Sequence, residues 1–351
     1  MSECRIRRGR TAAAAIAIGI CLSASASASA AAAAPALDAP KLELTAPPPR
    51  PIDELTPEAT IRLGKTADWV AVTEDAVWVG STGPYAVHRI DPATNQRVAS
   101  VALPGEPCAG LAVGLGSLWV PMCTATPSLA KVDLAANRLT AVFGVGPAAP
   151  EGGVTTGAGH VWLIVDKSGT LAKIDPATGA IRQTFKVPAG SYNPYFGDGR
   201  IWVTRAEGAE LSRIDAATGA LEGTVRTGPN PRFLTVAAGA AWTLNQGDGT
   251  LTRVDAHTER ATTIALNTPG HGGDIGFGAG LIWTTMPKMP LSGIDAASQS
   301  LRCRWAGPGG DSLGIGFGAI WLTDYHAGTV ARIPLPRILA HCGPRESMRD
   351  R

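Results

Sequence analysis

The sequence is poor in aromatic and charged residues, and its charges almost cancel. Aromatic residues make up 5% of the 351 residues and charged residues 17%, and the formal net charge is +2. Residues 1–34 contain four arginines and one glutamate, so 27 basic and 28 acidic residues remain beyond them. A chain this balanced lacks the long-range attraction to phosphate on which nucleic-acid binding depends. We therefore expect no nucleic-acid partner, whereas a hydrophobic content of 45% argues against disorder.

The sequence also lacks the uninterrupted apolar run of about 18 residues that marks a membrane-spanning helix. Its N-terminus combines a basic stretch at 1–10 with an apolar run of twelve residues at 11–22, followed by small residues. This order is typical of a secretory signal peptide, and we expect residues 1–34 to be removed by cleavage near 30–34. The mature protein would then be periplasmic or secreted, with no transmembrane anchor.

Cysteine is scarce, and the sequence has no C-x-x-C pair, so a metal–thiolate cluster is disfavoured. Beyond residue 34 four cysteines remain, and an even number in an exported chain indicates disulfides. Three pairings are formally possible. We favour Cys108 with Cys123 and Cys303 with Cys342, because Cys108 and Cys123 are symmetric about a predicted turn at 115–116.

The two ends of the chain differ from its middle. Residues 35–57 contain seven prolines, and such a composition predicts an extended, exposed linker. Residues 338–351 are expected to form a C-terminal tail.

The dominant feature of the sequence is an internal repeat of about forty residues. Tryptophans recur at spacings of 41, 43, 40, 40, 41 and 38, each inside a short apolar run. They stand at positions 78, 119, 162, 202, 242, 283 and 321. In six units an aspartate in a turn sequence such as IDAATG follows 12–14 residues after the tryptophan. Seven tryptophan anchors predict seven copies of one structural unit.

Each unit divides into four strand-length pieces in which apolar and polar residues alternate. In the unit around Trp202 these pieces are YNPYFGD, RIWVTR, LSRIDA and LEGTVRTG. Four-stranded units at this spacing are typical of β-propeller blades. The predicted fold is therefore all-β, a seven-bladed β-propeller over residues 58–337. A parallel β-helix is the rival architecture, but its coils would be about half as long.

Closure of the ring can also be predicted. The last unit ends after its third strand, at about residue 334, and residues 58–64 match the fourth-strand segments of other units. We expect this N-terminal strand to complete the seventh blade, because an open ring would present an exposed sheet edge.

The segment IWVTRAEGAELSRIDAATGALEGTVRTGPNP at 201–231 resembles bacterial YVTN-type propeller repeats and the streptogramin (virginiamycin B) lyase-like propellers. The resemblance covers roughly residues 58–334. It implies a seven-bladed fold and a divalent-metal-assisted, non-hydrolytic opening of a cyclic peptide lactone. It also implies a histidine near the start of a blade and a glutamate in a W-F-T-E-like run. Trp321-Leu322-Thr323-Asp324 is the nearest match to that run, with aspartate in place of glutamate, and His271 lies twelve residues before Trp283.

Propeller topology sorts the loops onto two faces. The loops that join one blade to the next open on the same face as the loops between second and third strands, and this loop face is where ligands are expected to bind. Blades six and seven supply His271, Asp274, Asp311, Asp324 and His326 to it. Two histidines and three carboxylates suit Mg²⁺, Mn²⁺ or Zn²⁺, and a histidine beside carboxylates can act as a general base. The alternative is that Asp311 and Asp324 cap turns and His326 is solvated.

Blades four and five supply a second group to the loop face, Tyr192, Arg205, Arg232 and Asn245. Two guanidinium groups suit a ligand that carries a carboxylate or a phosphate. Structural salt bridges between blades are an equally good interpretation.

The repeated residues are expected to be scaffold. The seven tryptophans are predicted to fill the core between blades, and the repeated aspartates to form turns. Trp69 and Trp305 fall outside the repeat and are the aromatic residues to test as a binding platform. His88, His160, His257 and His341 are expected to be hydrogen-bonded or solvated.

Two functions from different classes remain. The first is an exported propeller, expected to be a monomer, that binds a small molecule or a protein on its loop face without chemistry. The second is a metal-dependent carbon–oxygen lyase or a lactonase-like hydrolase that uses His271, Asp324 and His326, with Mg²⁺ or another divalent metal as its cofactor. The first needs no cofactor, and the sequence leaves open whether the protein is an enzyme.

Overall fold

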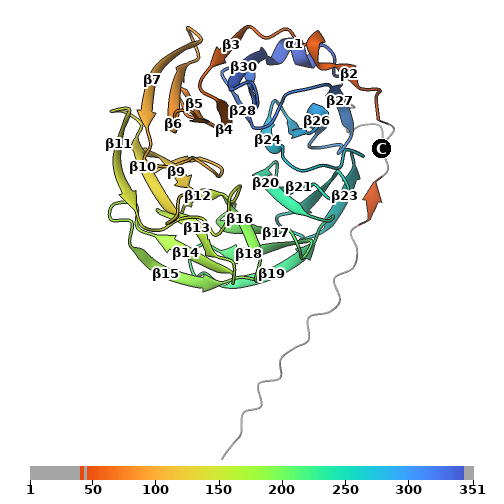
Figure 1. Ribbon diagram of the computed structural model, residues 1–351. Helices are drawn as coiled ribbons and strands as arrows, with labels where there is room; N and C mark the ends of the chain where they lie inside the picture. The colour runs from red at the N-terminus through yellow and green to blue at the C-terminus, as the bar shows by residue number, and fades with distance from the viewer. Residues whose placement is uncertain (1–39, 43–45, 344–351) are drawn as a thin grey trace, which may run out of the picture. The chain divides into compact units, whose positions relative to one another are not determined.

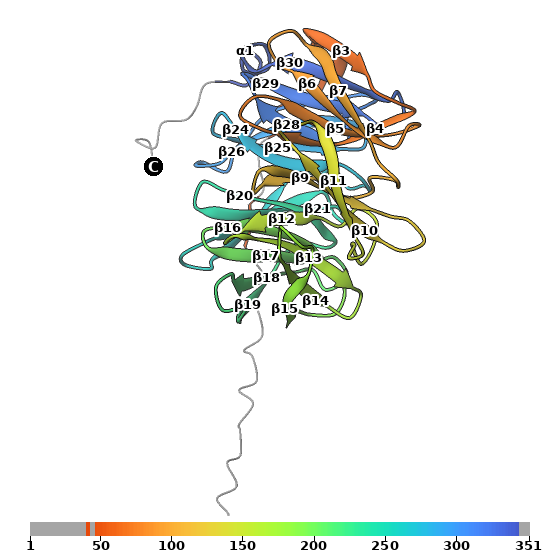
Figure 2. The same ribbon diagram turned by 90° about the vertical axis from the view of Figure 1, so that its left-hand side faces the viewer.

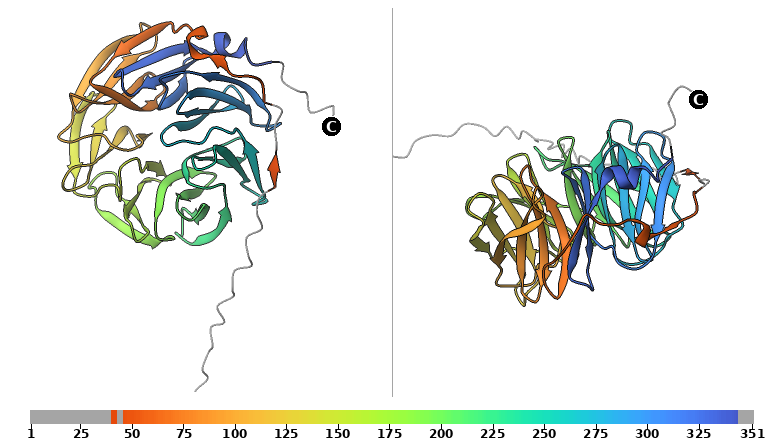
Figure 3. Two further views of the ribbon diagram at one scale, coloured as in Figure 1. Left: turned by 45° about the vertical axis from the view of Figure 1, so that its right-hand side comes forward. Right: turned by 90° about the horizontal axis from the view of Figure 1, so that it is seen from above.

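The structure, a computed structural model, describes residues 40–42 and 46–343. These residues form seven β-sheets that stand in a ring (Figure 1). Within each repeat the strands follow in chain order from the centre of the ring outward and pair antiparallel, and three N-terminal strands are added at the outer edges of three sheets. Figures 2 and 3 show the same ring from other directions. The prediction of an all-β, seven-bladed propeller is confirmed.

The blades are numbered along the chain, and their strands have the following bounds. Blade one contains β4 (Thr66–Val72), β5 (Val77–Thr82), β6 (Ala86–Asp91) and β7 (Gln96–Ala102). Blade two contains β8 (Ala112–Gly114), β9 (Ser117–Met122), β10 (Ser128–Asp133) and β11 (Arg138–Phe143). Blade three contains β12 (Val154–Gly157), β13 (His160–Asp166), β14 (Thr170–Ile174) and β15 (Ile181–Lys186). Blade four contains β16 (Ser191–Gly197), β17 (Arg200–Arg205), β18 (Glu210–Asp215) and β19 (Leu221–Arg226).

The remaining blades each include an N-terminal strand. Blade five contains β20 (Pro231–Ala237), β21 (Ala240–Asn245), β22 (Thr250–Asp255) and β23 (Ala261–Ala265), with β1 (Lys41–Leu42) added. Blade six contains β24 (Asp274–Gly278), β25 (Leu281–Met286), β26 (Met289–Asp295) and β27 (Leu301–Ala306), with β2 (Arg50–Pro51) added. Blade seven contains β28 (Leu313–Gly316), β29 (Ala319–Asp324), β30 (Thr329–Pro334) and β3 (Ala59–Arg62).

The ring is closed by the N-terminal strand, as predicted. Strand β3 pairs antiparallel with β30, with Ile61 opposite Val330. It therefore covers the edge that blade seven would otherwise expose.

Short turns link the first and second strands of blades two to seven. In each turn a residue with left-handed backbone conformation precedes a glycine, as in Ala238 and Gly239, whose φ angles are 51° and 70°. Two consecutive positive φ angles are what a type I′ hairpin turn requires, and this turn matches the twist of the paired strands. The other five turns begin at Leu115, Ala158, Asp198, Ala279 and Phe317.

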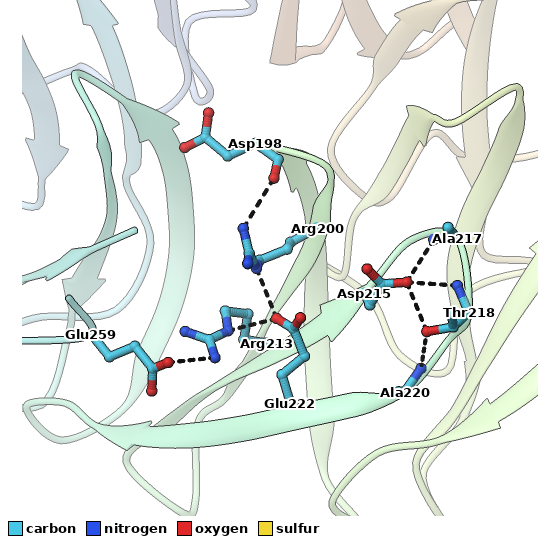
Figure 4. Close-up of polar contacts among 9 residues, drawn as sticks. All are labelled: Asp198, Arg200, Arg213, Asp215, Ala217, Thr218, Ala220, Glu222 and Glu259. Carbon is cyan, nitrogen blue, oxygen red and sulfur yellow. Dashed lines mark hydrogen bonds and ion pairs between the residues drawn. The ribbon is translucent and has the colours of Figure 1, made fainter. Parts of the chain in front are cut away.

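The repeated aspartates form turns between the third and fourth strands, as predicted. Asp215 Oδ1 accepts hydrogen bonds from the backbone N–H groups of Ala217 (3.1 Å) and Thr218 (2.6 Å) and from the Thr218 hydroxyl (2.7 Å) (Figure 4). The same two hydrogen bonds, from the backbone N–H groups two and three residues after the aspartate, are accepted in four other blades by Asp133, Asp175, Asp255 and Asp295. These side chains are occupied by their own turns and are scaffold.

The seven repeated tryptophans lie on the second strands and are fully buried. Trp162 of blade three, for example, belongs to one cluster with Ile201 and Val203 of blade four. The prediction of a core between blades is therefore confirmed. In four blades a basic residue of the third strand lies over the indole, as Lys131 does with its Nζ 5.5 Å from the Trp119 ring centroid. Its aliphatic stem covers the ring, and its charge gains a cation–π contact.

Both predicted disulfides form. Cys108 and Cys123 are joined with their Cα atoms 5.6 Å apart, and Cys303 and Cys342 with theirs 4.7 Å apart. Two disulfides indicate an oxidising compartment outside the cytoplasm. The predicted signal peptide at 1–34 lies outside the described residues. Within the described part of the chain, no helix is both long and apolar enough to span a membrane.

The proline-rich segment 35–57 differs from a simple exposed linker in its described part. Its strands β1 and β2 pair parallel with the outer strands β23 and β27. After the 3₁₀ helix η1 (Ile52–Glu54), Leu55 is buried in the core of blades six and seven. The physical reason is that outer strands carry unpaired backbone groups, which an extended segment can satisfy.

The segment after the last strand is also attached to the propeller. Helix α1 (Leu335–Leu339) follows β30 directly, and Ile338 is buried. The disulfide to Cys303 then ties Cys342 to β27 of blade six. Of the predicted tail, residues 338–343 therefore pack on the propeller, and 344–351 lie outside the described residues.

Candidate functional site

A cavity of about 430 Å³ opens on the predicted loop face, where the innermost strands begin. We call it the mouth cavity. Its walls are the adjoining ends of β4 and β5 in blade one, the loops that lead into blades two, three, six and seven, and the loop after β29 of blade seven. Its titratable side chains are Asp68, Glu106, Glu151, His271, Asp311, Tyr325 and His326. The topology therefore brings residues from distant repeats into one cavity.

Asp68 is held at the junction of blades one and seven. Its Oδ1 accepts hydrogen bonds from the backbone N–H of Trp69 (2.7 Å) and from the hydroxyl of Ser312 (2.6 Å). Burial, followed by the negative charge of Asp311, raises the pKa of Asp68 well above its ordinary value. This carboxyl is therefore electrostatically coupled to the next acid around the mouth.

Asp274 and Asp311 connect blades six and seven reciprocally. Asp274 Oδ2 accepts the backbone N–H of Leu313 at 3.2 Å, and Asp311 Oδ1 accepts the backbone N–H of Gly273 at 3.2 Å. Burial raises the pKa of Asp274 to about 7 and also raises the pKa of Asp311, to which the charge of Glu151 adds. Asp274 faces the central channel, whereas Asp311 faces the mouth cavity.

The histidines of blades six and seven meet at the mouth. His271 and His326 both line the cavity. The ring of His326 lies edge-on to Tyr325, with ring centroids 5.3 Å apart. Burial, with the charge of Asp68 next, raises the pKa of Tyr325. The predicted convergence of His271, Asp311 and His326 is therefore present in the structure.

Asp324 does not join this group of lining residues. Its Oδ1 accepts the backbone N–H of Ala327 at 2.9 Å, so the side chain caps the turn after β29. This is the structural alternative considered for Asp324, and it is the common role of aspartate in a turn.

The family resemblance implied a divalent metal as cofactor, and the expected convergence of loops from blades six and seven supplied Asp274, Asp311 and Asp324 as its acids. In the part of the chain that the structure describes, no three His, Cys, Asp or Glu side chains are grouped so that they could hold one ion. Asp274 and Asp311 are instead occupied by backbone N–H groups. These residues do not fit a resident metal ion, and no chemical step is derived through one.

Arg232 and Tyr192 form a group at the edge of the mouth. The Arg232 guanidinium lies over the Tyr192 ring at 4.8 Å from its centroid and donates to the Tyr192 hydroxyl at 2.9 Å. That hydroxyl donates in turn to the backbone oxygen of Pro150. Arg232 Nη1 also lies 3.3 Å from Glu151 Oε2. Its charge is therefore directed to a carboxylate of blade three.

Arg205 and Asn245 are engaged within their own blades. Arg205 pairs with Glu210 at 3.0 Å and donates to the backbone oxygen of Ala189 at 2.8 Å. Asn245 is fully buried, and its amide donates to two threonine hydroxyls of β22. Of the four residues predicted to bind an anion, only Tyr192 and Arg232 are therefore in contact, and the alternative of a salt bridge between blades describes Arg232 but not Arg205.

A second cavity, of about 510 Å³, follows the axis of the ring and is lined by the innermost strand of every blade. We call it the central channel. Its walls combine apolar side chains such as Leu111 and Ile315 with polar side chains such as Asn193 and Asp274. Of the two tryptophans outside the repeat, Trp69 lines both cavities, whereas Trp305 is fully buried in blade six and offers no binding platform.

Sequence reasoning did not single out the other acids of this site. Propeller topology also assigned Asp68, Glu151 and Tyr325 to the loop face, but nothing in the sequence distinguished them from other residues there as members of a site. No feature of the sequence marked Glu106 as a site residue, apart from its position two residues before Cys108. Ser312 stands in a G-x-S-x-G sequence at 310–314, yet it precedes a strand and donates to Asp68, so it is not a strand-to-helix nucleophile turn.

The fold and the cavity define a seven-bladed β-propeller with an acidic cavity at the mouth of its channel. No protein-family model and no curated protein matches the chain. Among solved structures it is similar to a streptogramin B lyase, with a TM-score of 0.64 and 18% identity over 78% of this chain and 96% of that chain. It is also similar to the virginiamycin B lyase of Staphylococcus aureus, with a TM-score of 0.66 and 15% identity over 79% and 98%.

A third similar structure is BamB from Moraxella catarrhalis, with a TM-score of 0.55 and 15% identity over 80% of this chain and 91% of that chain. At these identities the likeness shows the fold. It confirms the architecture that the resemblance to lyase-like propellers implied.

Proposed function

We propose that the protein binds a small cationic molecule in the mouth cavity, outside the cytoplasm. The observation that carries this proposal is the charge of the lining. Four acidic residues, Asp68, Glu106, Glu151 and Asp311, line the cavity, and no lysine or arginine is among the described residues that do so. Glu151 is paired with Arg232, and burial raises the pKa of Asp68 and Asp311, so the negative charge of the lining grows as pH rises. A concave site lined by charges of one sign concentrates ligands of the opposite sign.

The size and aromatic content of the cavity support the same ligand class. A volume of about 430 Å³ falls in the range of roughly 300–1,000 Å³ that is typical of small-molecule sites. Trp69 and Tyr325 line it beside the carboxylates. Aromatic faces attract organic ammonium groups, so these rings and the carboxylates favour the same ligand.

The engaged arginines argue against an anionic ligand. Arg232 is paired with Glu151 and stacked on Tyr192, and Arg205 is paired with Glu210. An anion would have to displace these contacts and then approach the carboxylates of the mouth. A protein partner remains compatible with the site, because a lysine or arginine side chain presents the same cationic group.

The proposal is tested by isothermal titration of the mature protein with benzyltrimethylammonium, with neutral benzyl alcohol and with benzoate. We expect binding of the ammonium ion alone. Asp311→Asn, which keeps an oxygen that can accept Gly273 N–H, should weaken binding about tenfold, since the attraction between two unit charges about 4 Å apart is about 1–4 kcal/mol at the surface of a protein.

Asp198→Asn is the matched control. Asp198 has left-handed backbone conformation in a turn of the opposite face, where asparagine is well tolerated. This variant should bind as the unmodified protein does. Equal binding of the ammonium ion and the neutral alcohol, or no effect of Asp311→Asn, would contradict the proposal.

A second candidate function is the opening of a cyclic ester, and one observation favours it. His271 and His326 line the same cavity as Asp311, so a base and acids face one volume. Incubation with a peptide lactone, followed by mass spectrometry, tests this. Elimination would leave the mass unchanged, hydrolysis would add one water, and either reaction should disappear in His271→Ala or His326→Ala. An unchanged substrate leaves binding as the function.

A further inference from the structure

Trp69 has an unusual backbone conformation for its position. It lies inside strand β4 with φ of 57°, at a point where the pairing with β5 shifts between Asp68 and Val70. Bulky residues rarely adopt this left-handed region. The other large apolar residues that do so, Leu115 and Phe317, lie in two-residue hairpin turns that require it. No turn explains the conformation of Trp69.

The neighbouring blade holds Trp69 in this conformation. Its backbone N–H donates to Asp68 Oδ1 at 2.7 Å, and the hydroxyl of Ser312 in blade seven donates to the same oxygen at 2.6 Å. Backbone strain persists only where surrounding contacts determine it, and such strain is concentrated at ligand-binding and active sites. The conformation of Trp69 therefore calls for a functional reason.

The side chain of Trp69 reaches across the ring. Its indole lies 5.9 Å from the ring of Phe233, and the two planes are inclined by 57°. Phe233 belongs to blade five, which is not a neighbour of blade one. The indole also passes over Gly110 of blade two, where a Cβ atom would lie 3.9 Å from Cε3. Contacts with blades two and five place the indole across the axis.

Trp69 is also the only described residue that lines both the mouth cavity and the central channel. The two volumes, of about 430 and 510 Å³, differ in character. Carboxylates, histidines and a tyrosine surround the mouth, whereas the channel is lined by the innermost strands, with apolar side chains such as Ile315 beside polar groups such as Asn193. A single side chain therefore separates the acidic mouth cavity from the channel.

We propose that Trp69 is the floor of the mouth cavity and determines how long a ligand the site accepts. A ligand whose cationic group meets the carboxylates stacks on the indole and does not extend into the channel. From the proposed function this inference takes only that the ligand carries a cationic group. It adds that the accepted ligands are compact and that their limit is set by Trp69.

The test measures binding along a homologous series, from tetramethylammonium through butyl-, hexyl- and octyltrimethylammonium. In the unmodified protein the affinity should not rise with chain length beyond butyl, because further methylenes remain in solvent. In Trp69→Ala the two cavities join, and a tail that packs on the apolar side chains of the channel should gain affinity with each methylene, by up to about fourfold. Trp69→Leu gives the same comparison with a milder change if the alanine variant does not fold.

Two further variants serve as controls. Trp69→Phe keeps a ring at the floor, so its affinities should stay independent of chain length. Phe277→Ala removes a half-exposed ring that lines the channel and not the mouth, and it too should show no dependence. If affinity changes with chain length in the same way in the unmodified protein and in Trp69→Ala, whether it is constant or rises, the proposal is overturned.

A ligand-free measurement separates this inference from the proposed function. The remaining eight tryptophans are fully buried, whereas Trp69 is 7% exposed and borders a cavity. Acrylamide should therefore quench the unmodified protein more than Trp69→Phe. Equal quenching would contradict a floor at Trp69. If quenching differs but no ammonium ion binds any variant, the proposed function fails and the position of Trp69 as the cavity floor stands.

Discussion

Arg213 of blade four and Glu259 of blade five form an ion pair between blades, with Nη2 2.6 Å from Oε1 (Figure 4). Arg213 also donates from Nε to Glu222 at 2.7 Å, and its side chain is only 11% exposed. The contact therefore extends a network within blade four to its neighbour.

Replacing the two partners should have unequal effects on stability. Arg213→Ala removes a nearly buried guanidinium from two carboxylates, and we expect it to lower the free energy of unfolding by about 1.5–3 kcal/mol. Glu259→Gln affects a half-exposed partner and should cost at most about 1 kcal/mol. Urea denaturation of both variants measures the difference. Equal losses would show that the contact between blades, and not the network within blade four, is the stabilising element.

The buried carboxyl of Asp274 predicts one component of the pH dependence of stability. Its pKa is raised from 3.8 to about 7 by burial, so the folded protein retains a proton that the unfolded chain releases. Its contribution is present below pH 3.8 and is lost as pH rises through 7. The upper limit is about 1.4 kcal/mol for each pH unit between the two pKa values.

Comparison of Asp274→Asn with the unmodified protein isolates this component. Urea denaturation at several pH values between 3.8 and 7 should show that the downward slope with rising pH disappears in the variant. An unchanged slope would contradict a protonated Asp274 in the folded state.

The buried ring of His88 predicts a second contribution to the pH dependence of stability, opposite in sign to that of Asp274. The ring is buried between the hydroxyls of Ser81 (2.8 Å) and Ser100 (2.9 Å), and burial, followed by the charge of Arg97, lowers its pKa from 6.5 to about 4. The folded state therefore resists a proton that the unfolded chain accepts. Stability from this source is present above pH 6.5 and is lost as pH falls through 4.

His88→Ser is the natural variant to test, because blades four and six carry Ser212 and Ser292 at the same register position. We expect this variant to lose less stability on acidification from pH 6.5 to 4 than the unmodified protein. Denaturation curves at both pH values provide the measurement. A larger loss in the variant would contradict a neutral His88.

The two disulfides should contribute unequally to the free energy of unfolding. Chain-entropy arguments assign about 3 kcal/mol to a 15-residue loop and about 4 kcal/mol to one of 39 residues. Replacing both Cys303 and Cys342 by serine should therefore destabilise the protein more than the same change at Cys108 and Cys123. Urea denaturation of the two double variants, with the reduced unmodified protein as reference, tests this. The reverse order would show that local strain or denatured-state structure outweighs loop length.

The fold could be predicted because the sequence pattern that specifies a blade is repeated within each blade. A tryptophan such as Trp202 and the alternation of the flanking strands recur in all seven repeats, and an aspartate turn such as that at Asp215 recurs in six; each acts on residues near it in the chain. The pairing of Cys108 with Cys123 was accessible for the same reason, since both flank one hairpin.

The site could be predicted only in part. The topology correctly placed His271, Asp311 and His326 on one face. It did not show that Asp324 caps its own turn, or that Arg232 is paired with Glu151 from two blades away. Side-chain direction on a loop depends on hydrogen bonds to groups from other repeats, which the sequence does not display.

The sequence by itself determined the number of blades and the strand that closes the ring, because these follow from the periodic pattern, and one hairpin paired Cys108 with Cys123, which left Cys303 with Cys342. The tertiary structure alone decided which loop side chains share the mouth cavity and that Trp69 lies between it and the channel. It also placed the N-terminal segment on the outer strands of blades five and six. These features depend on contacts between residues far apart in the chain, and only closure of the ring brings those residues together.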